Sequence, residues 1–139
     1  MKRMTLLGIL LSLIVLVSVS HAVIQPADIE IDIKPGSFPN SINVTSAGVI
    51  PVAILGSEVF DTADIEPATV RFGPGGADEA HGKGHVEDVN DDGLTDLVFH
   101  FYIQDTGLVC GDVATFLIGE TFSGETIGGI DFVNIVECN

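Results

Sequence analysis

The chain has 139 residues and a net charge of −15, with 20 acidic residues against five basic ones. A charge of this sign and size excludes nucleic acid and anionic membrane surfaces as partners, and it favours cations. An acidic surface also suits a salty medium, and that explanation stays open beside the first.

The first 22 residues have the pattern of a secretory signal peptide. Lys2 and Arg3 precede an apolar run from Leu6 to Val19, and Ser20-His21-Ala22 places small residues at positions minus three and minus one of a cleavage site. The run, roughly 14 residues, is short for a hydrocarbon core of about 30 Å, so we expect cleavage; a retained membrane anchor is the alternative. We expect residues 23–139 to form one domain without a membrane span, secreted to the extracellular space or cell surface, or else periplasmic.

Short β-strands are predicted along the rest of the chain. Residues 28–34 alternate isoleucines with charged residues, which is typical of a half-buried strand. Its charged face (Asp28, Glu30 and Asp32) is expected to be solvated, with a contact surface as the alternative. The apolar run 49–55 predicts a core strand, and Pro51 within it indicates an edge or a bulge.

Further strands are predicted at 69–72, 97–103, 114–118 and 130–136, with glycine, proline and polar residues between them. In 97–103 the alternation places Phe99 and Phe101 on the inner face and His100 on the outer one. Residues 61–67 offer one helical turn at most. Six or seven short strands predict an all-β fold, a small antiparallel β-sandwich of immunoglobulin-like architecture.

Two cysteines follow the predicted cleavage site, Cys110 and Cys138. In an exported protein an even number of cysteines indicates a disulfide bond. A bridge closing a loop of roughly 28 residues would stabilise the fold by roughly 3 kcal/mol in the chain-entropy treatment. Two free buried thiols are the alternative.

The segment 88–96, Asp-Val-Asn-Asp-Asp-Gly-Leu-Thr-Asp, carries oxygen side chains at its positions one, three, five and nine. Calcium prefers six to eight oxygen ligands from a loop that curls around it, often including a backbone carbonyl at position seven. Nearby carboxylates also repel one another unless a cation lies among them. The segment therefore predicts a calcium loop between two strands; an acidic solvated turn is the alternative. The predicted ligands are Asp88, Asn90, Asp92, the Leu94 carbonyl and Asp96.

This loop resembles the strand–loop–strand calcium loop of integrin-type repeats, Asp-x-Asn-x-Asp-Gly-x-x-Asp followed by a hydrophobic strand. The resemblance covers nine residues and implies the calcium chemistry without the propeller fold. An EF-hand would need flanking helices and a glutamate at position twelve, where Phe99 stands. A dockerin would need two such loops with helices, and this chain has one.

A second resemblance covers most of residues 23–139. It rests on the segments 31–37, 39–43, 48–55, 69–73 and 88–96. Together they are similar to a β-module that recurs in secreted bacterial and archaeal proteins, often as one part of larger extracellular chains. The resemblance implies export and a β fold, and it implies no activity.

A rival metal site would use His81 and His85 with Asp78 and Glu79 as zinc ligands. The His-x-x-x-His spacing places both rings on one face of a helix, but Gly82 and Gly84 disfavour a helix there. We therefore expect exposed loop histidines.

Enzyme signatures are scarce. The chain has no Gly-x-Ser-x-Gly segment and no phosphate-binding glycine loop with its lysine. Its many carboxylates leave a glycosidase pair as an alternative. We expect a non-catalytic, calcium-stabilised structural or adhesive extracellular module whose partner is an extracellular protein or a surface polysaccharide. The alternative is a calcium-dependent carbohydrate- or ligand-binding module, which the absence of tryptophan and the single tyrosine disfavour.

Overall fold

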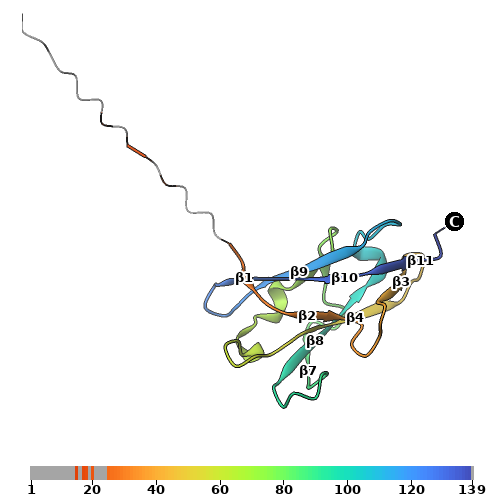
Figure 1. Cartoon of the computed structure of the whole chain (residues 1–139), viewed down its shortest axis with the longest axis horizontal. Coiled ribbons are helices and arrows are strands. Elements are labelled where there is room, and N and C mark those ends of the chain that lie inside the picture. Colours follow the sequence, from red (N-terminus) through yellow and green to blue (C-terminus); the bar gives the residue numbers. More distant parts are fainter. Residues whose placement is uncertain (1–14, 16, 19, 21–24, 139) are drawn as a thin grey trace, which may run out of the picture.

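Short strands are the main regular structure of the computed structural model, which describes residues 15, 17, 18, 20 and 25–138 (Figure 1). The predicted cleavage site and most of the predicted signal peptide lie outside the described residues. Among the residues that are described, no helix is long and apolar enough to cross a membrane. The strands are β1 (Ala27–Asp28), β2 (Ile31–Ile33), β3 (Ser41–Asn43), β4 (Val49–Ile54), β5 (Arg71–Phe72), β6 (Ala77–Asp78), β7 (His85–Glu87), β8 (Asp96–Tyr102), β9 (Ala114–Glu120), β10 (Thr126–Phe132) and β11 (Asn134–Val136), and the 3-10 helices are η1 (Thr62–Asp64), η2 (Pro67–Thr69) and η3 (Ile103–Asp105).

The strands form two main sheets and one small one. The larger sheet has the order β1-β10-β9-β5-β6, the second has the order β2-β4-β8-β7, and β11 pairs with β3. In Figure 1, β9 and β10 run along one side of the fold, and β2, β4 and β8 along the other. Most neighbouring strands are antiparallel; the exceptions are β1 with β10 and β11 with β3. The structure confirms the predicted all-β fold, a small sandwich of mainly antiparallel sheets.

The core lies between the two main sheets. Phe72 of β5 and Phe101 of β8 are fully buried, and their rings stack with centroids 5.1 Å apart. Phe99 is fully buried as well, which confirms the predicted inner face of the strand. The same alternation turns His100 to the opposite face of β8, where it is half-buried.

The strand predicted over residues 28–34 is divided between the two main sheets. β1 pairs with β10, whereas β2 pairs with β4, so the chain crosses from one sheet to the other at residues 29 and 30. Ile29 remains buried, and its N–H donates to the carbonyl of Gly128. The crossing requires close contact with β10: a Cβ on Gly129 would lie 2.7 Å from the Ile29 carbonyl oxygen. The strand predicted over 130–136 is likewise divided, into β10 and β11.

Pro51 lies in β4, an inner strand, at the point where its neighbour β2 has ended. The last pair of β2 and β4 is Ile33 with Val52, and the Pro51 carbonyl accepts a hydrogen bond from the N–H of Lys34. Because the N and C=O of a strand residue point to the same side, the missing N–H of Pro51 faces the space beyond β2. Proline is tolerated here as it is on an edge strand.

The predicted disulfide bond is present. Cys110 and Cys138 are joined, with a sequence separation of 28 residues. The bridge ties the segment after β11 to the connection between β8 and β9. The predicted helical turn is also present, as η1, with the side chain of Asp61 accepting the N–H of Ala63.

Candidate functional site

The acidic segment 88–96 connects the antiparallel strands β7 and β8. Glu87 and Asp96 form the last residue pair of this hairpin. The backbone reverses through two residues with left-handed φ angles, Asp91 at 56° and Gly93 at 82°. Glycine adopts such a φ angle without strain, so the sharp turn expected at Gly93 has its physical basis.

The oxygen side chains of the first three predicted ligand residues turn toward the backbone of their own loop. The Asp88 carboxylate accepts the N–H groups of Asp92 at 3.2 Å and Gly93 at 2.9 Å. The Asn90 side-chain oxygen accepts the N–H of Asp92 at 3.3 Å, and the Asp92 carboxylate accepts that of Leu94 at 2.8 Å. The loop is therefore already curled around these side chains, which are exposed to solvent.

Asp96 differs from the other predicted ligands because it is fully buried. One oxygen of its carboxylate accepts the N–H of Gly56 at 2.9 Å, and the other accepts that of Val89 at 2.8 Å. Gly56 lies against the neighbouring backbone: a Cβ there would be 2.2 Å from the carbonyl oxygen of Thr95. Asp96 thus fastens the end of the acidic loop to the segment that follows β4. Residue spacing carries no signal for this contact, which spans 40 residues.

The predicted calcium ligands lie on one loop but do not form a closed cage. Within the described residues, the ligand atoms of Asp88, Asp92 and Asp96 are not all within 4.8 Å of one another. Leu94, whose carbonyl is the remaining predicted ligand, lines an open hollow of about 540 Å³ beside the loop. Each carboxylate oxygen keeps a second lone pair beside its backbone hydrogen bond, so the donor set still suits a hard cation.

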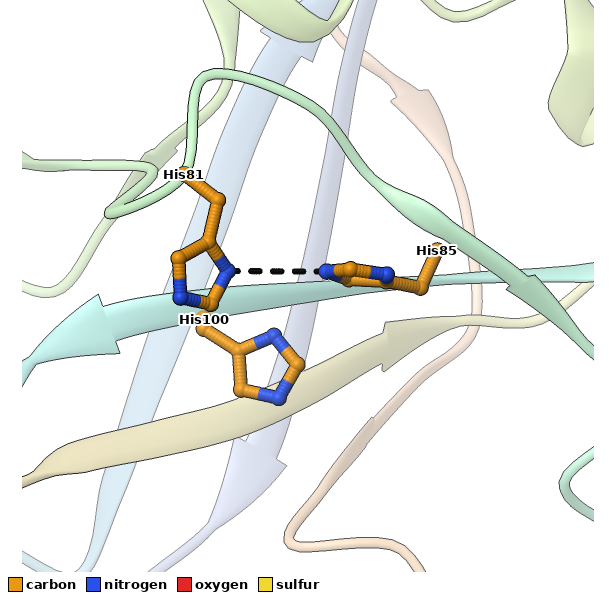
Figure 2. A group of neighbouring side chains, drawn as sticks. All are labelled: His81, His85 and His100. Atoms are coloured by element: carbon orange, nitrogen blue, oxygen red, sulfur yellow. Dashed lines mark hydrogen bonds between the residues drawn. The ribbon is translucent and has the colours of Figure 1, made fainter.

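Three histidines meet on the outer face of the second sheet (Figure 2). His81 comes from the connection between β6 and β7, His85 begins β7, and His100 lies in β8. His81 Nδ1 and His85 Nε2 are 3.5 Å apart, and one ring nitrogen from each histidine lies within 4.8 Å of the other two. Among the described residues, no other three histidine, cysteine or carboxylate side chains bring their potential ligand atoms within 4.8 Å of one another.

Glu79 positions the histidine cluster. Its side chain is 3% exposed. Its carboxylate accepts hydrogen bonds from three backbone N–H groups, those of His100 at 3.1 Å, Lys83 at 3.0 Å and His81. One carboxylate therefore holds the backbones of two of the histidines. Asp78, grouped with them from the sequence, instead pairs with Arg71 at 2.9 Å.

Of the two histidines expected in an exposed loop, His81 is exposed in the connection between β6 and β7, whereas His85 begins β7 and is half-buried. His81 and His85 meet without a helix, because a glycine-containing turn leads His81 back over β7 and β8. Sequence reasoning missed His100 as a member of the group. Its place on the outer face of β8 was the available signal, but nothing in the sequence indicated which loop covers that face.

The chain matches no protein-family model, no curated protein and no solved structure.

The electrostatics of the cluster favour the neutral form of His100. Burial lowers the pKa of His100, and the neighbouring His81 and His85 lower it further, against the opposing effect of Glu79 and Glu87. The Nδ1 atom of His100 is buried and has no hydrogen-bond partner among the described residues. A neutral ring with a free nitrogen can act as a metal ligand.

A second hollow, of about 310 Å³, lies between the start of β3 and the end of β10. Two exposed aromatic side chains, Phe38 and Phe132, line it together with Asp32 and Asp131. Burial raises the pKa of Asp32, and Asp131, Asp96 and Glu30 raise it further.

The raised pKa of Asp32 predicts a pH-dependent effect of Asp32→Asn. Because the folded protein binds this proton more tightly than the unfolded chain does, its stabilising contribution is present below the unfolded pKa and is lost as pH rises through the folded pKa. Asp32→Asn cannot ionise, so its stability relative to wild type should increase between acidic and neutral pH. Urea unfolding across that range measures it, with Asp28→Asn on an exposed carboxylate of the same segment as control. A difference that stays constant with pH would contradict the assignment.

Proposed function

We propose that the chain is a secreted structural or adhesive module, non-catalytic, that calcium stabilises through the loop 88–96. The supporting observation is that several carboxylates lie close together in this loop without a positively charged side chain paired to them. Among the described residues, Arg71 pairs with Asp78 and His81 lies beside Glu79, and no basic side chain lies within ion-pair distance of a carboxylate of the loop. The loop already curls around Asp88 and Asp92, so a hard cation would find oxygen ligands on one side of a short turn.

Calcium at this position would act on stability. The loop joins β7 to β8, and Asp96 links it to the segment after β4. An ion bound among the carboxylates would relieve their repulsion and fix the hairpin to the rest of the second sheet. At a free calcium concentration 100 times Kd, linkage adds about 2.7 kcal/mol to the free energy of unfolding.

The disulfide bond supports export. Disulfides persist in oxidising compartments and are rare in the cytosol, where thiols are kept reduced. The Cys110–Cys138 bridge is therefore what a protein acting outside the cytoplasm would carry.

An exposed apolar surface on the larger sheet supports the proposal that the module binds a partner protein. Ile130 of β10 lies opposite Phe116 of β9, and both are exposed, as are their neighbours Ile118 and Phe132. Exposed apolar patches of this kind mark interaction sites in soluble proteins. In an adhesive module this face would contact an extracellular protein.

The proposal is tested by thermal melts of the purified protein in calcium, in magnesium and in chelator. We expect Tm to rise by about 10 °C in calcium, from the linkage energy above and the usual entropy of unfolding of a domain of this size. The double variant Asp88→Asn, Asp92→Asn should lose this rise. A matched control, Asp28→Asn with Glu30→Gln, removes two exposed acidic charges outside the loop and should keep it. Identical melts in all three solutions would reject the calcium proposal.

One observation favours the alternative function, a calcium-dependent carbohydrate- or ligand-binding module. Phe38 is 96% exposed and Phe132 is 75% exposed, and both line the hollow that also holds Asp32 and Asn40. Exposed aromatic rings beside polar groups are what a sugar-binding surface uses. A glycan-binding screen with and without calcium distinguishes the two functions, since reproducible sugar binding that Phe132→Ala abolishes would favour the alternative.

A further inference from the structure

We propose that His81, His85 and His100 form a second metal site, which binds a divalent first-row transition metal such as Zn²⁺. The site lies on the outer face of β7 and β8 and is independent of the calcium proposal. Its ligands are nitrogens, whereas the acidic loop offers oxygens. Imidazole suits zinc, copper and nickel, while carboxylate and carbonyl oxygens suit calcium and magnesium, so the two sites would select different ions.

The spacing of the rings agrees with coordination of one ion. With Zn–N bonds of about 2.0–2.1 Å in a tetrahedron, two ligand nitrogens lie about 3.3–3.4 Å apart. His81 Nδ1 and His85 Nε2 are separated by 3.5 Å. The third nitrogen, from His100, completes a group within 4.8 Å, so binding one ion requires the rings to approach one another by at most about 1.4 Å. Figure 2 shows the His100 ring next to the line that joins the other two rings.

His100 carries the observation that points most directly to a ligand. Its Nδ1 is buried and lacks a hydrogen-bond partner among the described residues, although buried polar atoms are usually paired. An unsatisfied buried group costs about 1–3 kcal/mol. A metal ion shared with His81 and His85 would give this atom a partner without any other change in the fold.

Glu79 supplies the outer support that a metal site requires. The backbone N–H groups of His81 and His100 both donate to its buried carboxylate, so Glu79 fixes the backbone at two of the three proposed ligands. Carboxylates that hold metal-binding histidines in place tune both their orientation and their affinity. Because its oxygens already accept backbone hydrogen bonds, Glu79 acts as a positioning residue. The protein would then contribute three ligands and leave a fourth position on the solvent side, where His81 has a half-exposed side chain.

The test is a titration of chelator-treated protein with Zn²⁺ by calorimetry, followed by Co²⁺, whose visible spectrum reports nitrogen ligands in a tetrahedral field. We expect one ion per chain. His81→Gln and His85→Gln lie on exposed or half-exposed positions, so each should fold and lower the affinity at least tenfold. His100→Gln should do the same. Glu30→Gln, which removes an exposed carboxylate outside the histidine cluster, is the matched control and should leave the affinity unchanged.

The variant Asp88→Asn, Asp92→Asn separates this site from the calcium loop. It should keep Zn²⁺ binding while losing any calcium-dependent rise in Tm, so failure of one proposal is distinguishable from failure of the other. The histidine site is overturned if the wild-type protein shows no saturable Zn²⁺ binding, or if the double variant His81→Gln, His85→Gln binds Zn²⁺ as tightly as wild type.

Discussion

Replacing Asp96 with alanine is expected to lower the free energy of unfolding by about 2–5 kcal/mol, even in chelator. The carboxylate is fully buried, and it accepts the N–H groups of Gly56 and Val89. Alanine would leave the buried N–H of Gly56 and the half-buried N–H of Val89 without partners, and an unsatisfied buried donor costs about 1–3 kcal/mol. Urea unfolding followed by circular dichroism, with EDTA present, measures the loss without any contribution from calcium.

Two comparisons isolate the role of Asp96 as an anchor. Asp96→Asn keeps one acceptor oxygen but places an NH2 group against the other donor, so it should lose stability as well, by less than alanine. Asp88→Ala removes an exposed carboxylate of the same loop and should change the stability in chelator by less than about 1 kcal/mol. If Asp96→Ala is as stable as wild type in chelator, the anchoring role of Asp96 is wrong.

Removing the disulfide bond is expected to lower the free energy of unfolding by about 3–4 kcal/mol. The bridge spans 28 residues and includes all of β9, β10 and β11, so the unfolded chain gains considerable entropy when the loop is opened. The double variant Cys110→Ser, Cys138→Ser should show this loss in equilibrium unfolding. Wild-type protein unfolded in the presence of reductant should approach the stability of the variant.

The double serine variant also provides the control. Its stability should not respond to reductant, because it has no bridge to break. Equal stability of wild type and variant under oxidising conditions would mean that the bridge does not constrain the unfolded chain as its separation of 28 residues predicts.

Most of the strands could be predicted from the local alternation of apolar and polar residues in the sequence. Phe99 and Phe101 are buried as the alternation in residues 97–103 requires. The same kind of alternation could not show that residues 28–34 divide between two sheets, since Ile29, Ile31 and Ile33 all face the shared core. Nor does the pattern of residues 130–136 mark the break between β10 and β11. The two-residue strands β5 and β6 lack the length for a periodic signal, and they are defined by their pairing with each other and with β9.

The candidate sites differ in how far apart their contacting residues lie in the sequence. The acidic loop is a contiguous segment, so its oxygen side chains and its turn at Gly93 were readable from spacing alone. The anchoring of Asp96 depends on Gly56, 40 residues earlier, and Glu79 reaches the N–H of His100 across 21 residues. Contacts of this kind arise from strand pairing and loop placement. They could not be inferred from residue spacing, even though each participating residue was visible.

The parallel pairing of β1 with β10 has a mechanical consequence. β1, which is the first strand, runs parallel to β10, and β10 leads directly into β11, which is the last (Figure 1). Tension applied through the two ends of the domain would pull β1 and β10 in opposite directions along their common axis. The hydrogen bonds between them would then be loaded together in shear, and they would not be peeled apart one at a time. The Cys110–Cys138 bridge would also prevent the segment between its cysteines from extending under load.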